Sequence, residues 1–420
     1  MDPGGRRKMA RKRAAWPVGA TRLVWLADWR SSGGGRGDWL CRSCGRGDMG
    51  GCAAGAGHVL VLHRSDQDVG LLGLLSAISI CGWTAIFQID LGRAESPRDI
   101  RTDGMVWIPG GTFRMGSDHH YREEAPLHRV RVDGFWIDRT SVANAQFRSF
   151  VKEIGHITVA ETAPGPAHYP GALPHMLYAG SLVFEPPHRV HNLRDLGQWW
   201  TFMRGANWRR PYDPRSNIDV LGDHPVAHVA YSNALAYAKW AGKELPTEAE
   251  WEFTARGGLE ADEYAWGNAL TPGGKHMANI WQGSFPIQNL CEGGFDRTSP
   301  VTAFPANGYG VCDMIGNVWE WTAERWSARH EADPAKPCCI PQNPRGGREA
   351  ASYDPCQPAI RIPRKVLKGG SHLCAPNYCR RYRPAARQPE PIDTSTSHLG
   401  FHCVVRSPVP SQPPQTPSEK

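Results

Sequence analysis

Two cysteines near the C-terminal end of the chain, Cys374 and Cys379, have four residues between them. The intervening Pro376-Asn377 favours a turn, and a turn there would bring both sulfurs to one point. The spacing is not that of a zinc ribbon, and a pair of soft thiolates favours copper(I) over magnesium, calcium or non-haem iron. A plain disulfide between the two cysteines is equally compatible with the spacing.

Four arginines follow this pair closely: Arg380, Arg381, Arg383 and Arg387. A cation near a thiol stabilises the thiolate and lowers the pKa of that cysteine. Because the thiolate is the form that binds metal, the sequence predicts a cysteine pair that captures metal readily at neutral pH.

Several patterned segments must position this pair. Residues 105–116 predict a strand, a Pro-Gly-Gly turn and a second strand, because β-branched and aromatic residues flank the turn formers. Residues 141–154 and 232–242 repeat apolar side chains at helical spacing. A further helix is predicted after Thr247, which with Glu250 completes a capping box. Short strands and loops are expected from there to the end of the domain.

Composition favours an α+β fold that is rich in loops. The 420 residues include 46 Gly and 35 Pro, too many for a helical bundle, and 17 Trp, which indicate a core built from large aromatics. The net charge is +7, but the basic excess is concentrated in residues 1–68. The folded part therefore lacks the Lys/Arg cluster that a phosphate-binding surface needs, and no nucleic-acid partner is expected.

The N-terminal part carries two unusual segments. Residues 1–68 show no sustained period and are predicted to be disordered or, if translation starts downstream at Met49, absent. Cys41 and Cys44 supply only half of a zinc site. The apolar run 69–89 is long enough to cross a bilayer, so residues 69–91 are predicted to form an uncleaved anchor. The basic excess before the run places the catalytic domain outside the cytoplasm; the alternative is a leader or buried helix on a cytoplasmic bacterial enzyme.

The remaining boundaries follow from composition. Residues 92–104 are polar and are predicted to be a linker, residues 105–406 a single main domain, and residues 407–420, rich in Pro, Ser and Gln, a disordered tail.

Four segments, in chain order, resemble one family. They are MVWIPGGTFRMG from Met105, ELPTEAEWEFTARGG from Glu244, NGYGVCDMIGNVWEWT from Asn307, and KGGSHLCAPNYCRRYRPAAR from Lys368, closed by STSHLGFHC, which ends at Cys403. Together they resemble the formylglycine-generating enzyme, or sulfatase-modifying factor, family. The resemblance implies that family's C-type-lectin-like fold, loop-rich with little regular secondary structure.

The resemblance also implies a reaction. Cys374 and Cys379 would hold copper(I), and O2 would be the co-substrate. The substrate would be a Cys-x-Pro-x-Arg segment of a sulfatase-type polypeptide that has not yet folded, and its cysteine would become formylglycine. Ser371 matches a family serine beside this site. We expect the protein to act as a monomer.

Three further positions are implied to bind substrate. Trp319 and Arg387 match family positions near the peptide groove. His398 stands where the family commonly has Asn next to the active site, and His402 replaces the usual Arg of a Gly-Phe-Arg segment. The last two departures indicate altered substrate binding or a distinct subfamily.

Calcium is the second metal that the resemblance implies, because the family carries calcium ions at oxygen ligands. One expected set is Asp313 and Glu320 with the carbonyls of Gly316 and Val318. The other is Asn279 with the carbonyls of Ile280 and Phe295. In this second set Gly293 stands where a carboxylate is expected, with Glu292 or Asp296 as the substitutes that the sequence offers.

Other cysteines leave bridges open. Residues that pair as cysteines in animal members are replaced here by Ala238, Ala255 and Pro384, which leaves Cys403 without that partner. A local bridge among Cys338, Cys339 and Cys356 is expected only if the domain is exported.

Two other functions remain open. GNVWEW-type segments also occur in iron-dependent sulfoxide synthases, but the helical domain with His ligands that those enzymes carry is not evident in residues 1–104. The same fold also serves lectin-like binding modules that have lost catalysis.

Overall fold

The computed structural model describes residues 102–332 and 337–406. The predicted N-terminal segment 1–68, anchor 69–91 and tail 407–420 lie outside the described residues, as does most of the predicted linker 92–104. Within the two described ranges, no helix combines the length and the apolar character needed to cross a bilayer. The anchor over residues 69–91 therefore stays a prediction.

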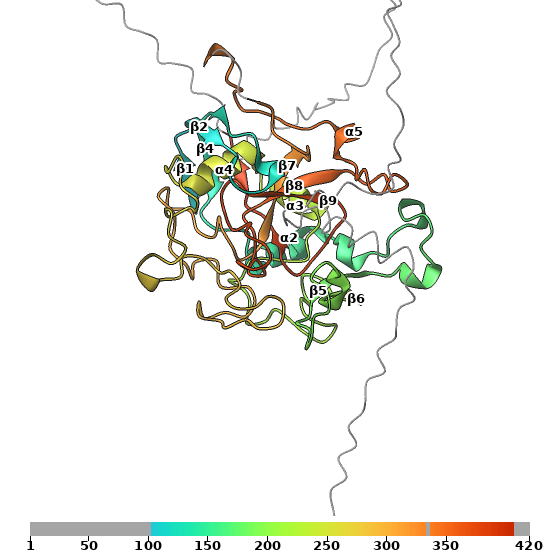
Figure 1. Ribbon diagram of the computed structural model, residues 1–420. Coiled ribbons are helices and arrows are strands. Elements are labelled where there is room, and N and C mark those ends of the chain that lie inside the picture. The colour runs from blue at the N-terminus through green and yellow to red at the C-terminus, as the bar shows by residue number, and fades with distance from the viewer. Residues whose placement is uncertain (1–101, 333–336, 407–420) are drawn as a thin grey trace, which may run out of the picture. The chain divides into compact units, whose positions relative to one another are not determined.

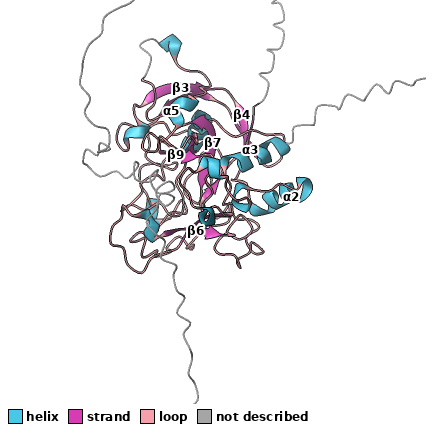
Figure 2. Cartoon of the chain, turned by 90° about the vertical axis from the view of Figure 1, so that its right-hand side faces the viewer, coloured by secondary structure: helices cyan, strands magenta, loops and turns pink. Residues whose placement is uncertain are grey.

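Short elements joined by long loops make up the domain, as Figure 2 shows. The strands are β1 Met105–Ile108, β2 Gly111–Met115, β3 His128–Val132, β4 Phe135–Asp138, β5 Gly180–Phe184, β6 Trp200–Arg204, β7 Trp319–Arg325, β8 Arg364–Lys368, β9 Arg387–Pro391, β10 Leu399–Gly400 and β11 Val404–Val405. The helices are α2 Asn144–Ile154, α3 Tyr231–Trp240, α4 Glu248–Arg256 and α5 Glu349–Ser352, with short 3-10 turns between elements. The predicted loop-rich α+β class is confirmed.

Four small sheets carry the strands. Their orders are β1-β4-β11, β10-β7-β8-β9, β2-β3 and β5-β6. The two strands predicted on either side of the Pro-Gly-Gly turn both form, but they do not pair with each other: β1 pairs with β4 and β2 with β3, all antiparallel. Figures 1 and 2 both place the β5-β6 hairpin at one end of the described domain, below the sheets that contain β4 and β7.

The helices follow local signals with one shifted start. Helix α2 begins at Asn144, three residues later than predicted, because the backbone of Val142 instead bonds to Phe401 and Val226. It ends at Gly155, whose φ of 68° is left-handed. The predicted capping box before α4 is confirmed, since Thr247 Oγ1 accepts a 3.1 Å bond from the backbone nitrogen of Glu250.

Two apolar clusters fill the interior. The larger one joins β1, β4, α2, α3, α4 and β7 and contains Trp251, Trp319 and Trp321, all fully buried. The smaller one packs the β5-β6 hairpin against Leu373 and Ala375. Large aromatic side chains therefore contribute to the core as the composition predicted, and the smaller cluster includes Leu373 and Ala375, which flank Cys374 in sequence.

Candidate active site

The structure brings Cys374 and Cys379 together, with their sulfurs 3.2 Å apart. The loop between them closes on Ala375, whose carbonyl accepts bonds from the backbone nitrogens of Tyr378 at 3.1 Å and Cys379 at 2.9 Å. A disulfide needs an S–S distance of about 2.05 Å, so both cysteines are thiols here. Both side chains are buried, each about 1% exposed.

The segment that enters this loop is fixed by backbone contacts. Gly370 follows β8 with φ 71°, and a Cβ at that position would lie 2.9 Å from the carbonyl oxygen of Arg381. Only glycine allows so close an approach. The carbonyl of Ser371 accepts a 2.9 Å hydrogen bond from the backbone nitrogen of Cys374, and the Ser371 hydroxyl accepts one of 3.2 Å from the backbone nitrogen of Leu373. Ser371 is thus buried at the base of the loop, as a residue beside the site must be.

Arg381 supplies the positive charge at the pair. Its buried guanidinium hydrogen-bonds to the Cys379 thiol, pairs with Glu123 at 2.6 Å and lies 3.8 Å from the centre of the Tyr121 ring. A hydrogen bond from Cys374 is the main cause that lowers the pKa of Cys379 to about 6; burial opposes this and Arg381 reinforces it. Burial raises the pKa of Cys374 well above its usual value. The pair is therefore one thiol and one thiolate at neutral pH.

The prediction that four arginines acidify the pair is wrong for three of them. Each of these pairs with a carboxylate of its own: Arg380 with Glu263, Arg383 with Glu124, and Arg387 with Glu248. None of the three is among the causes that lower the pKa of Cys379. Their neighbouring sequence positions did not reveal this, because their carboxylate partners lie more than 100 positions away in the sequence.

A cluster of aromatic residues that the sequence did not reveal lies beside the pair, with Tyr378 within electrostatic reach of both sulfurs. The rings of Phe285 and Tyr378 stack with centroids 4.4 Å apart, and Trp199 meets Tyr378 edge-on at 5.8 Å. The backbone nitrogen of Trp281 donates to the carbonyl of Cys374 at 3.0 Å. These aromatics come from three separate loops, and nothing in their local patterns distinguishes them from ordinary core residues. Only Pro376, Asn377 and Arg380 of this loop are exposed.

Trp319 and Arg387, predicted near the peptide groove, are both buried. Arg387 forks onto Glu248, with its Nε 2.8 Å from Oε1 and its Nη2 3.0 Å from Oε2, and donates to the carbonyls of Glu123 and Ser327. Trp319 begins β7 inside the larger apolar cluster. Direct contact of either side chain with a bound peptide would require a change of conformation.

His398 is also buried, just before β10. Its Nδ1 contacts the hydroxyl of Thr396, its ring centroid lies 4.9 Å from that of Trp200, and its carbonyl accepts from Trp319 at 2.8 Å. Burial lowers the pKa of His398 well below its usual value, so the ring is neutral. A neutral imidazole can exchange hydrogen bonds with a substrate but cannot supply a charge.

The two acids of the first predicted calcium set, Asp313 and Glu320, lie within electrostatic reach of each other. Asp313 has φ 54°, and one carboxylate oxygen accepts from the Asn317 amide at 2.9 Å while the other, Oδ1, has no partner. Burial raises the pKa of Asp313 to about 7. Glu320 accepts from Trp251 at 2.8 Å and from His402 at 2.7 Å on one oxygen, and its Oε1 has no partner.

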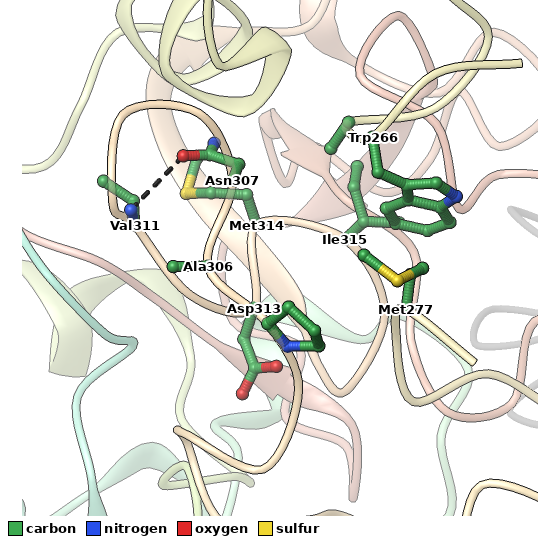
Figure 3. A pocket seen from close by; sticks show the side chains of 10 residues that line it. Trp266, Met277, Ala306, Asn307, Val311, Asp313, Met314 and Ile315 are labelled. Carbon is green, nitrogen blue, oxygen red and sulfur yellow. Dashed lines mark hydrogen bonds between the residues drawn. The ribbon is translucent and has the colours of Figure 1, made fainter. Parts of the chain in front are cut away.

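Two unpartnered carboxylate oxygens buried in one region are what a hard cation needs. Gly316 and Val318, whose carbonyls complete the set, lie between these acids in sequence, and the Gly316 nitrogen donates to Gly369 beside the cysteine loop. The residues therefore fit calcium. Figure 3 shows Asp313 at the edge of a cavity, its carboxylate directed away from Trp266.

The second predicted calcium set does not converge in this way. The amide of Gln282 lies among its members: Nε2 donates to the Ile280 carbonyl at 2.5 Å, and Oε1 accepts from the Gly293 nitrogen at 3.2 Å. The Asn279 amide donates to Arg297, and the Phe295 ring packs on Phe304 with centroids 6.0 Å apart.

Neither substitute carboxylate reaches this second set. Glu292 is exposed and lies 3.5 Å from His276, and Asp296 is exposed. A Cβ on Gly293 would lie 3.4 Å from Gln282 Nε2, so a hydrogen-bond donor stands where the missing carboxylate would reach. The residues present therefore do not fit a calcium ion.

The remaining cysteines are unbridged. No disulfide joins Cys338, Cys339, Cys356 or Cys403 in the described part of the chain, so the local bridge expected for an exported domain is not formed in this structure. Within residues 102–332 and 337–406, no group of three or more His, Cys, Asp and Glu side chains is arranged to hold a metal ion. An iron centre built on histidines thus finds no support in this part of the chain.

Comparison with known proteins identifies relatives over most of the chain. The model of the sulfatase-modifying factor enzyme 1-like domain matches residues 92–407. The formylglycine-generating enzyme of Mycobacterium tuberculosis is 51% identical over 301 residues, covering 71% of this chain and 97% of that protein. The enzyme of Mus musculus is 42% identical over 316 residues, covering 74% and 78%.

Inactive relatives are similar as well. The inactive C-alpha-formylglycine-generating enzyme 2 of Bos taurus is 42% identical over 342 residues, covering 78% of this chain and 96% of that protein. Overall identity therefore does not separate active from inactive members, and the site residues must do so. Because the domain match spans far more than half of its length, the chain belongs to the formylglycine-generating enzyme, or sulfatase-modifying factor, family.

Proposed function

We propose that this protein converts a cysteine of a sulfatase-type polypeptide to formylglycine, acting on a Cys-x-Pro-x-Arg segment and using copper(I) and O2. The observation that carries the proposal is the cysteine pair: two buried sulfurs 3.2 Å apart, one of them acidified. A formylglycine-generating enzyme that is 51% identical to this chain over 97% of its own length supports the proposal.

The donor set at the pair fits a soft monovalent ion. Cys374 and Cys379 would hold it, because thiolate sulfur prefers copper(I) and one sulfur is already ionised near pH 6. Bound there, copper(I) would supply the one-electron chemistry with O2 that a thiol-to-aldehyde oxidation needs. Oxidation of the substrate from CH2–SH to CHO releases two electrons and hydrogen sulfide. O2 accepts four electrons and provides the aldehyde oxygen and one water. The other two electrons come from two external thiols, which become a disulfide.

The chain's own residues prepare the site for this reaction. Arg381 keeps Cys379 ionised, and Glu123 with the Tyr121 ring holds the guanidinium in place. Phe285 and Tyr378 exclude water from the sulfurs, which protects them from side reactions. The exposed Pro376 and Asn377 at the tip of the loop are the part that a substrate segment meets first.

Calcium belongs to the proposal at one site. Asp313 and Glu320 would bind one ion through their unpartnered oxygens, together with the carbonyls of Gly316 and Val318. The second set is proposed to be free of metal, because the Gln282 amide takes the place of the ion.

Replacing the sulfurs tests the proposal directly. Cys374→Ser and Cys379→Ser should each abolish aldehyde formation on a Cys-x-Pro-x-Arg peptide supplied with copper, a thiol reductant and O2, because a hydroxyl does not bind copper(I). The product is measured by mass spectrometry of the peptide and by capture of the aldehyde with a hydrazide. Cys356→Ser, at an exposed position, is the control and should retain full activity.

A second function is favoured by the burial of both sulfurs and by the inactive relatives. In that case the protein binds the peptide without changing it. Wild-type protein that binds the peptide but forms no aldehyde under these conditions would support the binding function and contradict the oxidase.

A further inference from the structure

A second pair of thiols lies on the surface, away from any role in the proposed reaction. Cys338 and Cys339 end the short 3-10 turn Pro337–Cys339, and both side chains are exposed. Side chains of adjacent residues usually point apart, but these two sulfurs lie 3.6 Å from each other on one side of the chain. The surface thus presents a ready dithiol.

The segment after this dithiol is attached firmly to β3. The Arg131 nitrogen donates to Pro341 at 2.9 Å, and the Asn343 nitrogen donates back to Arg131 at 2.8 Å. The Asn343 side chain, on a backbone with φ 45°, accepts from the Asp133 nitrogen at 2.8 Å. These bonds give the two cysteines a fixed base, which lowers the entropy lost when both sulfurs bind one ligand.

A disulfide between these two cysteines is disfavoured. Consecutive Cα atoms are about 3.8 Å apart across a trans peptide, whereas disulfides usually require about 4.4 Å or more. The sulfurs would also have to move from 3.6 Å to bonding distance. A bond made under such strain is easily reduced, so the stable form of the pair is the dithiol.

We propose that Cys338 and Cys339 form a surface site that chelates one soft thiophilic cation, copper(I) being the ion of interest. With metal–sulfur bonds of about 2.3 Å, sulfurs 3.6 Å apart subtend an angle of about 100° at the ion. This bent arrangement leaves one side open to a third thiolate from a carrier molecule. Binding releases one proton from each thiol, and the copper stays monovalent, so no electrons are transferred.

This site differs from the buried pair in access. Cys374 and Cys379 are buried, whereas the surface dithiol meets solvent without any opening of the domain. The inference is independent of catalysis at the buried pair and holds or fails by binding alone.

Anaerobic titration of the full-length protein with copper(I), in competition with a chromophoric copper(I) chelator, counts the tight sites. All variants carry Cys41→Ser and Cys44→Ser, because that pair offers another set of two sulfurs. Cys338→Ser with Cys339→Ser should remove one equivalent of copper, and Cys356→Ser should remove none. Cys338→Ser alone should weaken the site about 100-fold, because the chelate is lost.

Phenylarsine oxide, which reacts with paired thiols, provides a second measurement. The protein carrying Cys41→Ser and Cys44→Ser should gain one adduct in its intact mass, and adding Cys374→Ser should not change this. Adding Cys338→Ser or Cys339→Ser to the same background should remove the adduct. Unchanged copper content in the double variant would overturn the proposal. So would peptide mapping that finds either surface cysteine bonded to Cys356.

Discussion

At the scale of single residues, the charge on Arg381 adds to the hydrogen bond from Cys374 in lowering the pKa of Cys379. The guanidinium contacts Cys379, while Arg380, one position earlier, points outward to Glu263. Opposite charge within about 4–6 Å lowers a pKa by roughly 1–3 units. The difference between these neighbouring arginines therefore gives a matched pair of variants.

Replacing Arg381 should make the thiolate harder to form. In metal-free protein, the thiolate absorbance in the ultraviolet should rise with a midpoint near pH 6, the pKa of Cys379. In Arg381→Gln the midpoint should move upward by about 1 unit or more, because the stabilising charge is gone. Arg381→Lys should preserve most of the shift, and Arg380→Gln should leave it unchanged. Equal midpoints in Arg381→Gln and the wild type would contradict this role.

At the scale of elements, three segments meet at one buried carboxylate. Glu252 of α4 accepts from the Gly116 nitrogen after β2 at 2.9 Å and from Lys368, the last residue of β8, at 2.9 Å. Burial favours the neutral acid, but Lys368 and Arg256 lower the pKa of Glu252 to about 2. Because Lys368 directly precedes the glycines of the cysteine loop, this network fixes where that loop starts.

Lys368→Met should destabilise the domain by about 3 kcal/mol, because Glu252 stays buried with Arg256 as its remaining cationic partner and loses the bond from Lys368. The free energy of unfolding in urea measures this. A depressed pKa gives Glu252 a stabilising contribution that is full above its unfolded value near 4.5 and is lost as the pH falls toward 2. The loss of stability between those pH values should therefore be smaller in the variant.

The control is Arg114→Met, which removes an exposed ion pair with Glu260 and should lower the free energy of unfolding by about 0.5 kcal/mol or less. Equal losses of stability in Arg114→Met and Lys368→Met would contradict the network.

Local elements were predictable from the sequence and long-range partners were not. The capping box at Thr247 and the glycine that ends α2 are signals within a few residues of each other, so both were predicted. The partner of β1 and the Glu123 that holds Arg381, 258 positions away, depend on tertiary contacts that no local pattern encodes. The close spacing of Cys374 and Cys379 thus predicted correctly that their sulfurs meet, while the residues that support them needed the structure.

At the scale of the whole molecule, most of the described domain is loop, so side-chain amides and bound ions are the groups that can fix the conformation of these loops. Residues 279–295 form one such loop, which Gln282 closes by bonding to both Ile280 and Gly293. A neutral amide in that position needs no counter-charge, which is consistent with a glycine where a carboxylate is expected. In the loop around Asp313 the Asn317 amide satisfies only one carboxylate oxygen, and Asp313 Oδ1 and Glu320 Oε1 have no partner, so the proposed ion would bind there.

Calcium content should therefore be one ion per chain, and it should fall to zero in Asp313→Ala because that site loses a charged ligand. Glu292→Gln and Asp296→Asn should leave one ion bound, since neither carboxylate reaches the second set. Gly293→Asp should raise the content to two: its Cβ meets no atom closer than 3.4 Å, and the new carboxylate can turn the Gln282 amide aside. Elemental analysis after gel filtration gives the number of calcium ions. When free calcium is present at about 100 times its dissociation constant, the second ion should raise the free energy of unfolding by roughly 2.7 kcal/mol. Two ions in the wild type, or one in Gly293→Asp, would show that the amide does not replace the metal.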